Sequence, residues 1–129
     1  MIFEYWMLFG AAAMGLVHVA AASFTFMAQV GNAYHVGPRD EDIQPTGMAG
    51  RMDRALRNYV ETFPIFVACV FLVDAADVIG PLSYWGSAVY LVGRVLYLPL
   101  YAIGIPWLRS FSWNAATLGL VVVGAQLLF

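Results

Sequence analysis

Lysine is missing from this 129-residue sequence, and charged residues of all kinds make up only 11% of it. The six positive charges are all arginines, whose planar guanidinium groups stay ionised and match carboxylates in geometry. A formal net charge of −2 and the lack of a basic tail argue against a nucleic-acid partner. The arginines therefore suit carboxylate binding better than a general role in solubility.

The sequence also has only one cysteine, Cys69. An internal disulfide framework is excluded, and no cluster of cysteine and histidine has the spacing of a zinc site, so no metal is predicted. Hydrophobic residues, in contrast, make up 62% of the chain, and the mean hydropathy is +0.76. One core of a soluble domain of this length cannot bury that much apolar surface, so the chain belongs to the membrane class.

Four apolar segments of about the ~20 residues that a bilayer requires are predicted to span the membrane. They cover residues 5–30, 52–78, 82–105 and 110–129. A cleaved secretory signal begins with positive charge, but the only charged residue ahead of the first segment is Glu4, so this segment is predicted to be a membrane anchor. The intervening segment 31–50, with its glycines, prolines and run of charges, is predicted to be a solvent-exposed connection. The sequence thus predicts an all-α integral membrane four-helix bundle forming a single domain, 1–129.

The distribution of arginine predicts the orientation of this bundle. Four arginines flank the first loop and Arg109 lies in the third, whereas the opposite side carries only Glu4, Asp74 and Asp77. By the positive-inside rule, the arginine-rich loops face the cytoplasm and both termini lie outside it. In a bacterium this would be the inner membrane.

The segment RMDRALRNYVETFPIF, residues 51–66, carries a polar stripe into an apolar run. At ~100° per residue its polar side chains occupy one third of a helix circumference. They are Arg51, Arg54, Arg57, Asn58 and Glu61. A second stripe on the next predicted helix, formed by Arg94, Tyr97 and Tyr101, follows the spacing i, i+3, i+7. The two stripes are predicted to face each other near the cytoplasmic side.

Glu61 and Arg94 both lie within apolar sequence, where a lone charge costs roughly 2.5 to 3.5 kcal/mol. We therefore expect antiparallel packing to bring them together. On one interpretation this ion pair only fixes helix register. On the other, the excess of arginines over carboxylates indicates a missing anion with several carboxylates, an ammonium group and amides. Glutathione is one such molecule among other acidic metabolites, and an arginine or hydroxyl donor would stabilise its thiolate.

These residues also match the motifs of a known family. The pattern R-x-x-R-A-x-x-N-x-x-E-x-x-P-x-F is met by Arg51, Arg54, Ala55, Asn58, Glu61, Pro64 and Phe66. Leu91 to Tyr101 is similar to a G-R-x-x-Y/H-x-x-x-Y signature, and Leu108-Arg109-Ser110 looks like the arginine and serine that precede the last helix. The chain resembles the MAPEG family, membrane-associated proteins in eicosanoid and glutathione metabolism, and especially its microsomal glutathione transferase and membrane prostaglandin E synthase branch.

The resemblance implies a homotrimer that binds glutathione between subunits at the cytoplasmic side, with a lipophilic substrate entering from the bilayer. It implies a transferase or peroxidase acting on hydrophobic electrophiles or lipid hydroperoxides. Glutathione would be bound by Arg51, Arg54, Asn58, Glu61, Arg94, Tyr97 and Tyr101. Arg109 would stabilise the thiolate, and Tyr101 or Ser110 would donate a hydrogen bond to the sulfur.

Two alternatives stay open at this point. One is a non-enzymatic lipid-binding or scaffold protein, because Leu56 stands where several active members have glutamine or histidine. Also, the segment beginning at Gln29 lacks the basic residue usual in eukaryotic members. The other is a small four-helix exporter, which needs an acidic residue deep in its first span; the only acid near that span is Glu4 at its end. Nothing in the sequence identifies the lipophilic substrate or distinguishes glutathione from another small thiol.

Overall fold

The structure is a computed structural model that describes all residues, 1–129, and its regular elements are all helices. They are α1 (Phe3–Val30), α2 (Asn32–Val36), α3 (Gly47–Ala75), α4 (Pro81–Ile103), α5 (Pro106–Ala125) and the 3-10 turn η1 (Gln126–Leu128). Four helices are long and apolar enough to cross a membrane. The predicted all-α fold with four apolar helices is confirmed, and it is the architecture of a multi-pass integral membrane protein.

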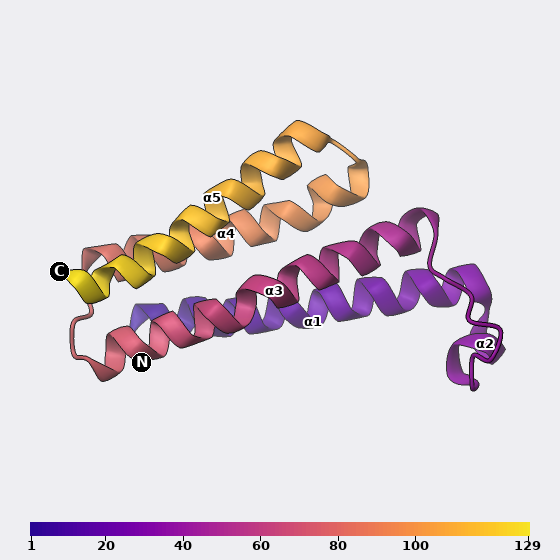
Figure 1. Ribbon diagram of the computed structural model, residues 1–129, viewed down its shortest axis with the longest axis horizontal. Coiled ribbons are helices and arrows are strands. Elements are labelled where there is room, and N and C mark those ends of the chain that lie inside the picture. The colour runs from indigo at the N-terminus through magenta and orange to yellow at the C-terminus, as the bar shows by residue number, and fades with distance from the viewer.

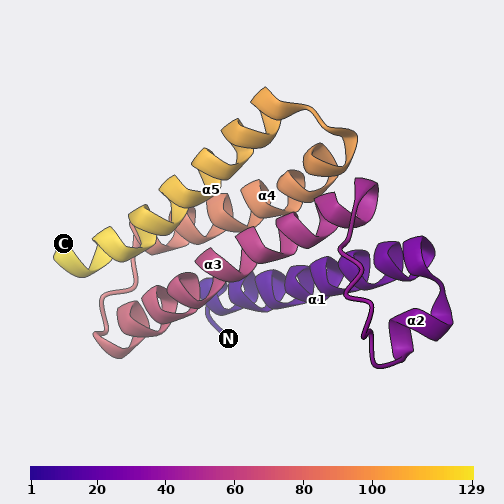
Figure 2. The same ribbon diagram turned by 45° about the vertical axis from the view of Figure 1, so that its right-hand side comes forward.

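The four long helices form two antiparallel pairs, with α1 along α3 and α4 along α5 (Figures 1 and 2). Both termini and the α3–α4 connection lie at one end of the bundle. We call it the outer end, after the orientation that the arginine distribution predicts. The short α2 and the α4–α5 turn lie at the other end, called the loop end. The polar stripes of residues 51–61 and 94–101 fall in the halves of α3 and α4 nearer the loop end.

The helix bounds differ in places from the predicted spans. Helix α3 begins at Gly47 instead of residue 52, so the charged segment is helical from its first residue. It ends at Ala75, because Asp77 adopts a left-handed conformation with φ 58°. The predicted loop 31–50 contains the short helix α2. Pro64 lies inside α3 and Pro99 inside α4, and each helix continues past its proline.

Helices α4 and α5 approach each other closely along a seam of small residues. A Cβ added at Gly86 would lie 2.6 Å from the carbonyl oxygen of Gly119, and one added at Gly93 would lie 2.8 Å from Cβ of Ala116. The Ser112 hydroxyl donates a hydrogen bond of 2.5 Å to the Gly93 carbonyl across this seam. Small residues and interhelical hydrogen bonds are the usual means of joining helices in lipid. The seam holds α4 and α5 together as a unit.

Aromatic side chains connect this unit to the other pair. The ring of Phe66 on α3 stacks on Tyr90 of α4 with centroids 4.1 Å apart, and the Tyr90 hydroxyl lies 3.0 Å from Oγ1 of Thr62. Tyr59 on α3 donates its hydroxyl to the carbonyl of Ala11 on α1. These buried hydroxyl groups therefore have interhelical partners, which polar groups need where water is excluded.

A polar network closes the outer end. Oε1 of Gln126 accepts hydrogen bonds from the backbone N–H groups of Leu82 at 3.0 Å and Ser83 at 3.2 Å, so η1 caps the first turn of α4. The Ser83 hydroxyl donates to Oε1 of Glu4 at 2.6 Å. This network links the beginning of α1, the beginning of α4 and the end of the chain.

Candidate functional site

A cavity of about 300 Å³ lies between α3, α4 and α5 toward the loop end. Its lining residues are Asn58, Tyr97, Tyr101, Arg109, Ser110, Trp113 and Asn114. The chain turns from α4 into α5 at Gly104, whose φ of 81° is a left-handed conformation that glycine adopts without strain. This tight turn brings Tyr101, near the end of α4, close to Arg109 in the first turn of α5.

Tyr101 is the centre of the cavity's contacts. Nε of Arg54 on α3 donates a hydrogen bond of 3.0 Å to the Tyr101 hydroxyl. The guanidinium carbon of Arg109 lies 4.7 Å from the centroid of the Tyr101 ring, within cation–π range. Two permanently charged groups from two helices thus meet on a single phenol, while no carboxylate is among the lining residues.

Arg94 lies behind this cavity and is almost fully buried, with 1% of its surface exposed. Its Nη1 donates a hydrogen bond of 2.7 Å to Oδ1 of Asn58, and its guanidinium carbon lies 4.9 Å from the Tyr59 ring centroid and 4.5 Å from that of Tyr97. Nε and Nη2 have no acceptor. The burial of a cation with two nitrogens that lack acceptors is costly unless another group accepts their hydrogen bonds.

The expected ion pair between Arg94 and Glu61 is not formed. Asn58 takes that place, and the structure's one ion pair joins Arg57 to Asp53 at 3.1 Å. Asn58 lies one helical turn before Glu61, on the same stripe, so the face was predicted correctly and the partner was not. Glu61 is exposed, and its carboxylate makes no hydrogen bond or ion pair within the chain.

The other residues of the predicted site divide into two groups. Asn58, Tyr97, Tyr101, Arg109 and Ser110 line the cavity, and Arg54 and Arg94 contact its lining residues. Arg51 and Glu61 stay at its margin: Nη1 of Arg51 donates to the Ala102 carbonyl at 3.0 Å, near the end of α4. The structure thus brings seven of the nine predicted residues together.

Trp113 and Asn114 line the cavity although sequence reasoning did not select them for the site. Both follow Ser110 by three and four residues, which places them on the same helix face. Asn114 donates its Nδ2 to the Ser110 carbonyl at 2.8 Å, and the buried Nε1 of Trp113 has no hydrogen-bond partner. The i, i+3, i+4 spacing from Ser110 was the available signal.

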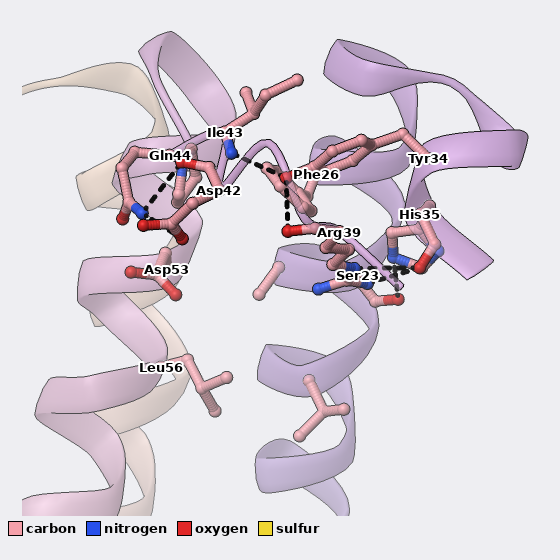
Figure 3. Close-up of a pocket in the computed structure, with 13 residues that line it drawn as sticks. Ser23, Phe26, Tyr34, His35, Arg39, Asp42, Ile43, Gln44, Asp53 and Leu56 are labelled. Atoms are coloured by element: carbon pink, nitrogen blue, oxygen red, sulfur yellow. Dashed lines mark hydrogen bonds between the residues drawn. The ribbon is translucent and has the colours of Figure 1, made fainter. Parts of the chain in front are cut away.

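A larger cavity, of about 400 Å³, lies between α1, α2, the following loop and α3 (Figure 3). Its polar groups bond mainly to one another: Nε and Nη2 of Arg39 donate to the His35 carbonyl at 3.0 and 2.7 Å, and the Ile43 N–H donates to the Tyr34 hydroxyl at 2.6 Å. Leu56 lies on its α3 wall. The polar groups of this larger cavity already have partners. The cavity around Tyr101, where Arg54 and Arg109 have no carboxylate partner, is therefore the candidate site.

Gln29 has a structural contact near the same loop. Its Nε2 donates to the Gln44 carbonyl at 3.0 Å, and its Oε1 accepts from the Thr46 N–H at 2.8 Å.

No group of three or more histidine, cysteine, aspartate and glutamate side chains could hold a metal ion. The chemistry available at the site is therefore that of arginine, tyrosine, serine and asparagine, which bind anions and donate hydrogen bonds.

Comparison with known proteins gives a family match over nearly the whole chain. The model of the MAPEG family matches residues 3–129, a range that includes all four long helices and every residue of the cavity. Comparisons with curated proteins and with solved structures found no match. The motifs in residues 51–66 and 91–101 predicted this relationship, and the chain belongs to the MAPEG family.

Proposed function

We propose that the protein is a glutathione-dependent membrane transferase or peroxidase acting on hydrophobic electrophiles or lipid hydroperoxides. One observation carries the proposal: Arg54 and Arg109 both contact Tyr101, in a cavity lined by no carboxylate. Arginines gathered without counter-charges form a site for an anion with more than one acidic group. Membership of a family that includes glutathione transferases and peroxidases supports glutathione as that anion.

The free hydrogen-bonding groups suit different parts of glutathione. Arg54 presents guanidinium N–H groups for its carboxylates, with Arg51 at the margin as a further donor, and the buried Arg94 behind Asn58 and Tyr97 adds positive charge and nitrogens without acceptors. The Oδ1 of Asn58 is occupied by Arg94, which leaves its Nδ2 to donate to a peptide carbonyl. The exposed Glu61 carboxylate is available for the ammonium group.

The thiol would lie beside Tyr101, Arg109 and Ser110. Arg109 stabilises the thiolate electrostatically, because an adjacent cation favours the charged form of a thiol. The Tyr101 hydroxyl accepts its bond from Arg54, so its own proton is free to point at the sulfur. Ser110, the next residue along α5, offers a second hydroxyl from the cavity wall.

The thiolate then reacts with a lipophilic partner. With an electrophile, a sulfur–carbon bond forms as the leaving group departs with its electron pair. With a hydroperoxide, sulfur attacks the terminal oxygen and the O–O bond breaks, giving an alcohol and a sulfenic acid. A second glutathione reduces the sulfenic acid to a disulfide and water. The protein's part is to bind, orient and ionise the thiol.

We further propose that a homotrimer completes the site at the cytoplasmic side of the membrane. Arg51 and Glu61 are exposed charged residues on the α3 stripe. Charges turned toward lipid are costly, so another copy of the chain is the fitting neighbour for this face. The lipophilic substrate would reach the cavity from the bilayer between subunits.

The alternative of a non-enzymatic lipid-binding or scaffold protein depended on Leu56 and Gln29. Leu56 lines the other cavity, and Gln29 hydrogen-bonds to the loop that follows α2. Neither residue occupies the wall of the proposed site. Within one chain, the two positions therefore remove no group from the cavity, so neither counts against the enzyme there.

Glutathione binding by the full chain in a nonionic detergent tests the proposal. We expect saturable binding by calorimetry at millimolar glutathione or below, a thiolate absorbance in the ultraviolet, and conjugation of a generic aromatic halide. S-methylglutathione, which has no ionisable thiol, should bind without the absorbance. Binding without thiolate formation or conjugation would support the scaffold alternative, and no binding at all would overturn the glutathione site.

A further inference from the structure

A carboxylate without a counter-ion lies at the outer end of the bundle. Glu4, in the first turn of α1, is 3% exposed, and its Oε1 accepts the Ser83 hydroxyl at 2.6 Å. Oε2 accepts no hydrogen bond within the chain, and the one ion pair of the structure is elsewhere, between Arg57 and Asp53. A buried carboxylate in a membrane protein is expensive unless a cation or several donors serve it.

Capping of α4 does not explain this carboxylate. Backbone N–H groups at the start of a helix can be satisfied by an acidic side chain. At α4, however, Gln126 already accepts from the N–H groups of Leu82 and Ser83, and the Gly80 N–H donates to Oγ of Ser83. The charge of Glu4 is therefore not needed to cap the helix.

The Glu4 side chain lines a cavity of about 550 Å³ whose other walls are apolar and aromatic. Phe3 stacks on Tyr84 with ring centroids 3.8 Å apart, and Trp85 stands edge-on to Tyr84 at 5.2 Å. Glu4 is the only charged residue among the lining residues. Aromatic faces attract organic cations, and the volume falls within the ~300 to 1,000 Å³ typical of small-molecule sites.

We propose that this outer cavity binds an alkylammonium group, with Glu4 as its counter-ion and the rings of Phe3, Tyr84 and Trp85 around its alkyl substituents. The group belongs either to a free organic cation or to the headgroup of a choline lipid, which present the same chemistry. The site lies at the opposite end of α4 from the Tyr101 cavity, so it is independent of the proposed glutathione chemistry.

Titration of the full chain with choline and with its uncharged carbon isostere, 3,3-dimethylbutan-1-ol, tests the proposal. The readout is the indole N–H resonance of Trp85, assigned with the variant Trp85→Phe and followed in a maltoside detergent at constant ionic strength. We expect a saturable shift with choline and affinity for the alcohol weaker by about tenfold. Equal affinity for the two compounds, or no saturable shift with choline, would overturn the site.

Two variants locate the binding group. Glu4→Gln keeps an oxygen that can accept the Ser83 hydroxyl but removes the charge, so choline affinity should fall by about tenfold or more. The matched control is Asp77→Asn at the same end: Asp77 is exposed, outside the cavity, and has a φ of 58° that asparagine tolerates, so affinity should not change. Unchanged affinity in Glu4→Gln would refute the assignment. If that variant does not fold, Tyr84→Leu, which keeps the carboxylate, should weaken choline several-fold.

Nanodiscs distinguish the two sources of the cation. In phosphatidylglycerol discs free choline should shift the Trp85 resonance. If the shift disappears in phosphatidylcholine discs, the lipid headgroup occupies the site, and if it persists there, the occupant is a free cation. A Trp85 resonance that responds to choline in neither lipid would contradict the proposal.

Discussion

The hydroxyl of Tyr101 and Nε of Arg54 lie 3.0 Å apart, and the hydrogen bond between them joins α4 to α3. Because α4 is fixed to α5 by its glycine seam, this bond also sets where Arg54 stands relative to Arg109. The positions of the two cations therefore depend on one phenol. A change at any of the three residues should alter the affinity for an anion bound among them.

Replacing Arg54 with glutamine should mainly weaken glutathione binding. A charge-assisted hydrogen bond contributes about 1.5 to 3 kcal/mol, so the dissociation constant should rise roughly ten- to hundredfold in calorimetry. Arg57→Gln is the matched control, because Arg57 lies on the same helix but is paired with Asp53 outside the cavity. Equal losses in the two variants would indicate a nonspecific effect of positive charge on α3.

Arg109→Gln should mainly lower turnover, because the thiolate loses its nearest cation. We expect glutathione still to bind, with thiolate absorbance and the rate of conjugation reduced by about tenfold or more. Tyr101→Phe keeps the ring beneath Arg109 and removes only the hydroxyl that contacts Arg54. If Arg109→Gln retained full thiolate absorbance, the thiol would be stabilised by another residue.

Asn58→Leu should destabilise the fold as well as the site. Asn58 supplies the only hydrogen-bond acceptor of the buried Arg94 guanidinium, and a buried donor left without an acceptor costs about 1 to 3 kcal/mol. The free energy of unfolding in a detergent titration should fall by that amount. Asn114→Leu, at an exposed position whose amide bonds only within α5, should leave stability within about 0.5 kcal/mol.

Gly86→Ala should separate α4 from α5. The new Cβ would lie 2.6 Å from the Gly119 carbonyl oxygen, and backbone must move to admit it, at a cost of about 1 to 3 kcal/mol. At Gly124 a Cβ would meet only Sγ of Cys69 at 3.6 Å, an ordinary contact. Gly124→Ala should therefore be neutral or stabilising by up to about 1 kcal/mol. Thermal unfolding of the two variants compares the positions directly.

The orientation inferred from the arginines can be tested by cysteine labelling. In a Cys69→Ser background, Asp77→Cys should react with a membrane-impermeant maleimide in intact cells, and Asp40→Cys only after the membrane is opened. Both positions are exposed in the structure and lie in connections at opposite ends of the bundle. The reverse labelling pattern would place the Tyr101 cavity outside the cytoplasm.

Much of the fold follows from local sequence properties. Long, mostly apolar segments, separated by glycine, proline and charge, were enough to predict the four long helices. Helix α2 was missed because five residues carry too little periodic signal. The start of α3 at Gly47 was also missed, since its first turn contains small residues whose burial is visible only in three dimensions, as for Ala49 and Gly50.

Helical spacing predicted which residues share a face, but it could not give the relative height of two helices. That is why Glu61 was expected to pair with Arg94, whereas the α3 residue opposite Arg94 is Asn58, one turn away. Contacts along α5 were harder to predict from the sequence, because Trp113 and Asn114 line the cavity only through the close packing of α5 against α4 at the glycine seam.

The division of the cavity between two helical pairs has a consequence for any fragment of the protein. A hairpin of α1 and α3 would carry Arg54 and Asn58, and a hairpin of α4 and α5 would carry Arg94, Tyr101 and Arg109. Neither fragment holds a complete set of anion-binding groups. Glutathione affinity would therefore report the correct association of the two halves, and a split protein would recover it only by reassembly in the bilayer.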